Sequence, residues 1–365
     1  MKSGSAWLLA AALLVVASPH VSAADDYLIT TVAGTGERGY AGDGGAATRA
    51  TFAWKWGWGL CVDSSDCLYI IDSDNNRIRK VDASGRIATV AGNGAFGASG
   101  DGGPATEASL KHPCGIDLDK AGNLYIGDQS ARVRKVDASG IITTVAGIGA
   151  VGHTGDGGPA TAAKIWGFPK PRIDHEGNLY ILDSGEHQIR RVDRVTGIIT
   201  TVAGTGRKGF FSGDGGPAIK ADLWSPSEMC FDRQGNMYVV DSMNQRIRRV
   251  DAAGIITTVA GGGNPGEEKE GGPATKADLW HPDGVSFDGD GNLWLTDTGR
   301  HRIMKVDAAG NIWTIAGTGG LGYAGDGGPA SKALLNLPAN LRFAADGSIY
   351  FLDWGNYVVR KLYLP

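Results

Sequence analysis

The chain has 365 residues, with 35 basic and 39 acidic side chains and a formal net charge of −4. No basic stripe interrupts this mildly acidic balance, so the composition disfavours binding to nucleic acid. The 58 glycines accompany an apolar fraction of 42%, which is typical of a turn-rich all-β protein rather than of a disordered one.

The N-terminus predicts a secretory signal peptide over residues 1–23. Lys2 precedes an apolar run over residues 7–17, and small residues lead up to a cleavage position after Ala23. The apolar run is too short to span a bilayer, and no later segment approaches the necessary length. We therefore expect a secreted or periplasmic mature chain over 24–365 with no membrane span.

A glycine-terminated segment recurs along the whole mature chain. The sequence IITTVAG occurs at 141–147, 198–204 and 255–261, and close variants occupy the equivalent places elsewhere. Consecutive copies are 55 to 58 residues apart and end at Gly34, Gly92, Gly147, Gly204, Gly261 and Gly317. A period of this length, with strand-like segments inside it, indicates a propeller.

Each unit is predicted to contain four short antiparallel strands rich in Val, Ile, Thr and Tyr and bounded by Gly or Asp turns. In the second unit these strands are residues 115–119, 123–126, 133–136 and 141–146. Six such units predict an all-β, six-bladed β-propeller. The sixth unit lacks its own last strand, so we expect residues 29–34 to pair with 358–361 and close the ring.

The second unit resembles a known repeat. Its residues 112–137, HPCGIDLDKAGNLYIGDQSARVRKVD, and the five equivalent segments resemble NHL repeats, which build six-bladed β-propellers. The resemblance covers the mature chain and implies a single NHL-type propeller domain over 24–365. It implies no particular activity, because the family includes protein-binding, RNA-binding and enzymatic members and a shared fold does not transfer a function.

Polar residues that recur in most units are interpreted as structural. An aspartate follows the second strand of every unit, and an arginine follows four or five residues later in four of them, so we expect ion pairs within blades. The aspartates are Asp72, Asp128, Asp183, Asp241, Asp297 and Asp353, and the arginines are Arg77, Arg132, Arg246 and Arg302.

An insert with the core GDGGPA precedes most units. Its aspartate is a candidate calcium ligand, but a carboxylate that accepts hydrogen bonds from loop amides is the simpler interpretation. A disulfide between Cys61 and Cys67, which flank a tight turn, is left open.

Polar and aromatic residues that break the repeat are better candidates for a site. The loops before the first strands and after the second strands are expected on one face, around the mouth of the central channel. We expect these loops to supply the ligand-binding residues Trp56, Trp58, Lys170, Asn340, His187 and His301. Trp56 and Trp58 would form a platform for a sugar ring or an apolar ligand. The tryptophans at equivalent loop positions in three units are interpreted as packing anchors: Trp166, Trp224 and Trp280.

An alternative hypothesis places a divalent cation, calcium or zinc, at the same mouth. Its ligands would be Asp283, Glu228 and His281, and the catalytic candidates are His112, His281, Glu228 and Lys170. Residues 282–297, PDGVSFDGDGNLWLTD, resemble a strand pair of the gluconolactonase/SMP-30-type propellers, which implies a metal-ligand role for Asp283. Lys170 at the same mouth opposes a cation. Amidating lyases of the NHL class would carry histidines directly after the loop proline, where this chain has Cys114, Lys170, Ser227, Asp283 and Ala339.

The sequence therefore favours an exported, monomeric binding or interaction module that recognises a small molecule, a carbohydrate or a protein on its loop-rich face. The alternative is a secreted metal-assisted hydrolase or lyase, lactonase-like or carbohydrate-active, with its site at the mouth of the channel. No Gly-x-Ser-x-Gly motif and no phosphate-cradling loop before a helix occurs in the sequence. The sequence leaves open whether the protein is an enzyme.

Overall fold

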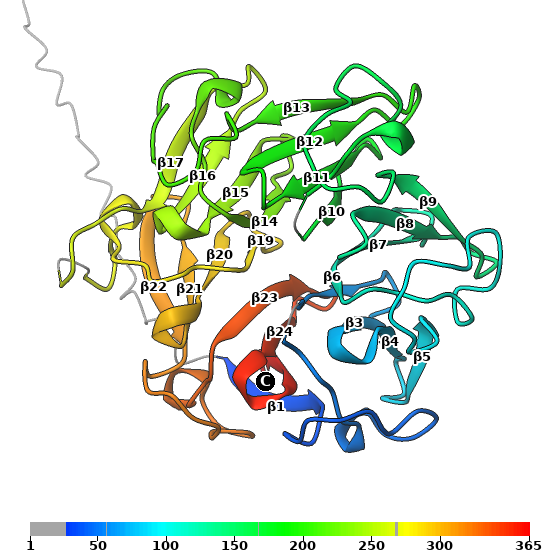
Figure 1. Ribbon diagram of the computed structural model, residues 1–365. Coiled ribbons are helices and arrows are strands. Elements are labelled where there is room, and N and C mark those ends of the chain that lie inside the picture. Colours follow the sequence, from blue (N-terminus) through cyan, green and yellow to red (C-terminus); the bar gives the residue numbers. More distant parts are fainter. Residues whose placement is uncertain (1–26, 56, 167, 267–268) are drawn as a thin grey trace, which may run out of the picture.

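The computed structural model describes residues 27–55, 57–166, 168–266 and 269–365. These residues form six antiparallel sheets arranged around a central axis, as Figure 1 shows. The predicted all-β, six-bladed propeller is confirmed. The described part of the chain contains no α-helix, and none of its helical turns is long and apolar enough to cross a membrane. The predicted signal peptide, residues 1–23, lies outside the described residues.

Each blade has four main strands, and the first strand of each lies nearest the axis (Figure 1). Blade one contains β2 (Leu60–Val62), β3 (Leu68–Asp72), β4 (Arg77–Val81) and β5 (Ile87–Ala91). Blade two contains β6 (Pro113–Leu118), β7 (Leu124–Asp128), β8 (Arg132–Val136) and β9 (Ile142–Ala146). Blade three contains β10 (Lys170–Ile173), β11 (Leu179–Asp183), β12 (Gln188–Val192) and β13 (Ile199–Ala203).

The other three blades follow the same order, with two additions. Blade four contains β14 (Pro226–Phe231), β15 (Met237–Asp241), β16 (Arg246–Val250) and β17 (Ile256–Gly261). Blade five contains β19 (Val285–Phe287), β20 (Leu293–Asp297), β21 (Arg302–Val306) and β22 (Asn311–Ala316), with β18 (Gly272–Pro273) at its outer edge. Blade six contains β23 (Pro338–Phe343), β24 (Ile349–Asp353), β25 (Val358–Tyr363) and the N-terminal β1 (Leu28–Ala33).

Short 3-10 helices occupy the inserts between blades and the turns after second strands. Those in the inserts are η2 (Ala47–Arg49), η4 (Ala160–Ala162), η5 (Ala218–Lys220), η7 (Ala274–Lys276) and η9 (Ala330–Lys332). Those after second strands are η3 (Ser73–Asn75), η6 (Ser242–Asn244), η8 (Thr298–Arg300) and η10 (Trp354–Asn356).

The N-terminal strand completes the last blade. β1 pairs antiparallel with β25, where Ile29 lies opposite Leu362 and Thr31 lies opposite Arg360. Ile29 and Leu362 are fully buried and belong to the apolar layer between blades five and six. The predicted closure of the ring by the two ends of the described chain is therefore confirmed.

The hydrophobic core lies between neighbouring blades rather than within one blade. Between blades one and two, for example, Ile71 and Ile78 pack with Ile116 and Ile126. Side chains on a strand alternate between the two faces of its sheet, so each blade needs an apolar neighbour on both sides. Ring closure supplies the missing neighbour for the first and last blades.

In blades one, four and six the buried aspartate at the end of the second strand pairs with an arginine seven residues later, not with one four or five residues later. In blade four, Asp241 pairs with Arg248 at 3.2 Å, and both side chains are inaccessible to solvent. The predicted partner Arg246 donates instead to the carbonyl of Asn244 at 2.6 Å and stacks on Phe211. The two arginines lie on one face of the strand, two residues apart, and the sequence alone does not tell which is buried.

Blade five keeps the predicted pairing. Met304 takes the place of the buried arginine there, and Arg302 pairs with Asp297 at 2.7 Å. The aspartate is therefore paired in blade five by the arginine that lies directly opposite it in the ladder.

The inserts fold over the outer strands of the following blade. Asp101 accepts hydrogen bonds from the amide and hydroxyl of Thr144 at 3.1 and 2.6 Å, and from Arg134 at 2.6 Å. Burial alone would raise the pKa of Asp101, but the bonds from Thr144 and Arg134 outweigh it and lower the pKa. The equivalent aspartates also pair with arginines: Asp43 with Arg79, Asp156 with Arg190, Asp214 with Arg248 and Asp326 with Arg360. These contacts favour the structural interpretation of the insert aspartates over calcium binding.

We expect Asp101→Asn to lower the free energy of unfolding by about 1 kcal/mol, because a partly exposed charged acceptor is lost. Urea unfolding would measure this change, with exposed Glu107→Gln on the same insert as the control. Calcium at millimolar concentration should leave the melting temperature of the wild type unchanged. A calcium-dependent rise that disappears in Asp101→Asn would instead establish a cation site in the insert.

Cys61 and Cys67 do not form a disulfide, because all four cysteines of the chain are free. Cys61 lies opposite Tyr69 in the ladder, and Cys67 lies two residues before that position. Diagonal neighbours of this kind are about 7–8 Å apart, which is beyond the reach of a disulfide.

Candidate functional site

Two adjoining cavities lie at the mouth of the central channel. Each has a volume of about 290 Å³, and both are lined by Trp58, Ser225 and Ser227. Residues from the loops after second strands, such as Ser184 and Thr298, complete the walls. The two sets of loops therefore meet on one face, as the sequence predicts. Trp56 lies outside the described residues.

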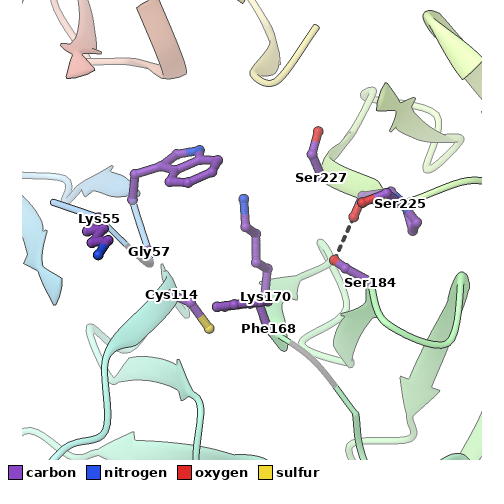
Figure 2. Close-up of a pocket in the computed structure, with 10 residues that line it drawn as sticks. Lys55, Gly57, Cys114, Phe168, Lys170, Ser184, Ser225 and Ser227 are labelled. Carbon is purple, nitrogen blue, oxygen red and sulfur yellow. Dashed lines mark hydrogen bonds between the residues drawn. The ribbon is translucent and has the colours of Figure 1, made fainter. Parts of the chain in front are cut away.

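Lys170 extends from β10 into the first cavity, as Figure 2 shows. It is only 7% exposed, and its Nζ lies 4.0 Å from Oδ2 of Asp283 and 5.1 Å from the centre of the Trp58 ring. Within the described chain, this ammonium group donates no hydrogen bond, and Asp283 is its nearest counter-ion. A buried charge without hydrogen bonds is unfavourable. The cavity therefore offers a position where an acceptor on a ligand, or water, would stabilise Lys170.

Lys170 lies deeper than the mouth position that the sequence predicts. It pairs with Leu182, one residue before the buried aspartate of its blade, just as Glu228 pairs with Val240 in blade four. Blade four has a β-bulge at the start of its first strand, whereas the described first strand of blade three shows none. Lys170 consequently stands level with Glu228 and not with Ser227.

A cluster of buried charges fills the channel beside Lys170. Glu228 accepts hydrogen bonds from Nε of Arg172 at 2.6 Å, from Nη2 of the same residue, from Nδ2 of Asn340 at 2.6 Å and from Arg342 at 3.3 Å. Burial alone would raise the pKa of Glu228, but Arg172, Arg342 and Lys170 outweigh it and lower the pKa to about 2. Glu228 is therefore a permanent anion that neutralises the arginines.

The sequence analysis missed three members of this cluster: Asp117, Arg172 and Arg342. Asp117 accepts a hydrogen bond from the amide of Ile173 at 2.8 Å, and burial raises its pKa. These residues lie two positions beyond Lys170 or its equivalents on the first strands, so they point toward the same axis. The unit comparison held a usable signal there, because the position differs between blades: Cys61, Asp117, Arg172, Cys230, Ser286 and Arg342.

Asn340 connects three blades below the mouth. Its amide N–H donates to Asp283 at 3.1 Å, its Nδ2 donates to Glu228, and its side-chain oxygen accepts from the amide of Leu60 at 3.3 Å. The residue is 1% exposed. A ligand-binding role for Asn340 stays a prediction, and the structure shows it positioning the charged residues around it.

His187 and His301 stabilise loops at the mouth. Their Nδ1 atoms accept hydrogen bonds from amides of the next blade, Ser225 at 3.0 Å and Leu337 at 3.1 Å. Burial lowers the pKa of both imidazoles. Nδ1 as an acceptor requires the neutral ring with its proton on Nε2. Their role in ligand binding stays a prediction.

The remaining candidates for metal binding and catalysis lie apart. His112 packs against Phe96 with ring centres 5.1 Å apart, whereas His281 and Asp283 line the second cavity. Glu228 is already paired with arginines. The described residues contain no group of three His, Cys, Asp or Glu side chains that could hold a metal ion. The metal site therefore stays a prediction.

The three tryptophans that the sequence analysis interprets as packing anchors are partly exposed. Trp166 is 43% exposed and Trp280 is 49% exposed. The buried aspartate of each blade accepts a hydrogen bond from the tryptophan amide: Asp183 from Trp166 at 3.1 Å, Asp241 from Trp224 at 2.7 Å and Asp297 from Trp280 at 2.7 Å. The repeated aspartate thus fixes these rings at equivalent places on the mouth face.

Asp183 differs from its equivalents in the other blades. Its Oδ2 is buried without a hydrogen-bond partner, and burial raises the pKa of Asp183 to about 8. In blade four, Asn244 donates to the aspartate from three positions further on, whereas blade three has Glu186 there. The carboxylate of Glu186 cannot donate a hydrogen bond, so no side chain stabilises the ionised form of Asp183 in this way. Asp183 therefore keeps its proton near neutral pH.

The stability of the protein should consequently fall as the pH rises toward 8. The folded state holds the Asp183 proton up to about pH 8, whereas the unfolded state loses it near pH 4, so this contribution decreases between those values. We expect Asp183→Asn to remove a slope of about 1 kcal/mol per pH unit between pH 5 and 7. Urea unfolding across this range would measure the slope, with exposed Asp290→Asn as the control. Equal slopes in wild type and Asp183→Asn would contradict the assignment.

The closed ring of six four-stranded blades, with its ligand-sized mouth cavities, defines the class of a six-bladed β-propeller. The family model described as NHL repeat matches residues 279–305, and the model described as Teneurin NHL domain matches 95–153 and 210–266. These matches confirm the resemblance to NHL-repeat β-propellers that is stated from the sequence.

Curated relatives share the repeat at moderate identity. Teneurin-4 of Mus musculus is 26% identical over 328 residues, which cover 81% of this chain and 10% of that protein. NHL repeat-containing protein 2 of Bos taurus is 26% identical over 333 residues, covering 82% and 45%. The chain therefore spans less than half the length of these relatives.

Solved structures share the fold. An auxiliary nutrient binding protein from Bacteroides ovatus superposes with a TM-score of 0.65 at 17% identity, covering 93% of this chain and 76% of that one. A Bacteroides thetaiotaomicron protein of unknown function gives a TM-score of 0.66 at 18% identity, covering 92% and 75%. At this identity the likeness concerns the fold alone.

Proposed function

We propose that this propeller is an exported binding module that holds a small acidic ligand, of the class of the sugar acids. The ligand would lie in the first of the two cavities at the mouth, which we call the mouth cavity. The observation that carries the proposal is the buried ammonium group of Lys170. It enters the cavity and donates no hydrogen bond within the described chain. A ligand carboxylate would form a charge-assisted hydrogen bond with it. The ring of Trp58, 5.1 Å from Nζ, would pack against the apolar face of the ligand.

The composition of the cavity supports an anionic ligand. Lys55 and Lys170 both line the first cavity, and no acidic side chain is among its described lining residues. Hydroxyl groups of Ser184, Ser225 and Ser227 line the same wall and can bond to the hydroxyl groups of a sugar. A cavity of about 290 Å³ suits a ligand at the small end of the usual range.

Export is supported by the apolar N-terminal run over residues 7–17. A fold neighbour from Bacteroides ovatus is described as an auxiliary nutrient binding protein, which agrees with a binding role. The metal-assisted hydrolase or lyase has less support, because Glu228 is paired with Arg172 and His112 packs against Phe96.

Titration of the mature protein with D-galacturonate, followed by tryptophan fluorescence and calorimetry, tests the proposal. Lys170→Met should weaken binding by roughly 10- to 100-fold, because a hydrogen bond between charged groups is lost. Exposed Lys220→Met is the control and should bind like the wild type. Equal affinity for neutral D-galactose, or an unchanged affinity in Lys170→Met, would reject the proposed site.

A further inference from the structure

An open groove adjoins the mouth cavity on the mouth face of the propeller. It is lined by Trp166, Trp224, Met243 and Lys208, among others, and has a volume of about 780 Å³. It shares Phe168, Ser184 and Ser225 with the mouth cavity, so the two spaces adjoin. A ligand held at Lys170 and longer than the cavity would therefore extend into this groove.

Two exposed tryptophans, Trp166 in the groove and Trp280 outside its described lining, lie close against glycines of the loops after the second strands. A Cβ atom at Gly185 would lie 1.6 Å from Cδ1 of Trp166, and one at Gly299 would lie 1.8 Å from Cδ1 of Trp280. Only glycine lets the indoles approach this closely. Each of these two residues is thus held close to the chain and is still 43% or 49% exposed.

The three tryptophans form an arc over three consecutive blades. We call the set Trp166, Trp224 and Trp280 the aromatic arc. Their backbone amides are held by equivalent buried aspartates, so the spacing of the rings follows the symmetry of the propeller. Partly exposed aromatic rings at equivalent positions of consecutive blades suit a ligand that repeats an apolar face along its length.

We infer that the protein binds a linear acidic polysaccharide, with one sugar acid in the mouth cavity and the following sugars along the aromatic arc. This inference rests on the proposed function for the mouth cavity and extends it from one sugar to a chain. Pyranose rings present apolar C–H faces that pack on indoles, and their hydroxyl and carboxylate groups remain available to solvent or to Lys208. A peptide is less favoured, because its side chains do not repeat one apolar face along the chain.

Binding of galacturonate chains of one, three and six sugars to the mature protein tests the inference. Calorimetry on the wild type should give an affinity that rises about tenfold or more from one sugar to six. Trp166→Ala and Trp280→Ala should each weaken binding of the six-sugar chain about tenfold, the effect of losing one aromatic contact of about 1.4 kcal/mol, and leave the single sugar unaffected. Lys170→Met should weaken binding of every length.

Two further variants separate the arc from general effects on folding. Gly185→Ala keeps Trp166 but displaces its ring, so it should reduce the affinity for the six-sugar chain as Trp166→Ala does. Phe96→Ala removes an exposed aromatic ring that does not line the groove and should leave the affinity unchanged. Melting temperatures of all variants would verify that they are folded.

The outcomes distinguish this inference from the proposed function. If one sugar binds through Lys170 but chain length has no effect, the arc is overturned and the mouth site stands. If long chains bind through the tryptophans while Lys170→Met has no effect, the mouth site fails. The inferred placement of one sugar acid in the mouth cavity fails with it. Equal affinity for a neutral maltohexaose would overturn the acidic specificity, and no binding of any chain would overturn both.

Discussion

Glu228→Gln is expected to lower the free energy of unfolding by about 3 kcal/mol at pH 7. The carboxylate neutralises the buried guanidinium group of Arg172 and the partly buried one of Arg342, and is itself completely buried. The substituted amide would keep some hydrogen bonds but no charge, so both arginines would remain in the channel without their counter-ion. Breaking a buried ion pair on one side is more destabilising than removing the whole pair.

The effect should depend on pH in one direction. The pKa of Glu228 is lowered to about 2 in the folded protein, whereas an unfolded glutamate has a pKa of about 4.3. The stabilisation is therefore present above about pH 4.3 and is lost as the pH falls through 2. Urea unfolding at pH 7 and pH 3 would measure this, with exposed Glu107→Gln as the control. A difference below about 1 kcal/mol at pH 7 would show that the channel does not depend on this ion pair.

Gly127→Ala is expected to lower the free energy of unfolding by about 3 kcal/mol and to weaken ligand binding at Lys170. A Cβ atom at Gly127 would lie 1.8 Å from the carbonyl oxygen of Pro169, and one at Gly115 would lie 2.6 Å from the Cα atom of Lys170. Both clashes are with backbone atoms, so no side-chain movement relieves them. The glycines of blade two thus let β10 approach closely and carry Lys170 into the channel.

Gly289→Ala is the matched control, because a Cβ atom at Gly289 meets no atom within 4 Å. Urea unfolding of both variants gives the stability, and titration with galacturonate gives the binding. A Gly127→Ala protein as stable as Gly289→Ala would mean that blades two and three separate at little cost. Unchanged binding by that variant would show that the close approach is not needed to place Lys170.

The buried charges also determine what kind of site the channel can be. Glu228, Arg172, Arg342 and Asn340 bond to one another across the axis. They close the channel beneath the mouth with groups that are already paired. The space left for a ligand at the mouth is therefore the two mouth cavities and the groove beside them, and Lys170 is the charged group that lies between the buried cluster and that space.

Comparison of the six units within the sequence predicted much of the fold. The glycine-ended segments gave the period and the strands, and the displaced copy at residues 29–34 predicted the pairing of β1 with β25. The comparison also separated the repeated aspartates from residues such as Lys170 that occur in one blade. It was right about the arginine partner in blade five but wrong in blades one and four, because two arginines share a strand face there, as Arg246 and Arg248 do, and only burial distinguishes them.

The sequence by itself determined the number of blades, their strand order, the closure of the ring and the face on which the loops before the first strands meet those after the second strands. These features follow from local chain preferences and from a repeat that every blade obeys. Only the tertiary structure decided the depth of Lys170, the pairing of Glu228 with Arg172 and the exposure of Trp166 and Trp280. Each of these depends on how closely neighbouring blades approach, and that distance is set by contacts such as Gly127 with Pro169 between residues far apart in the chain.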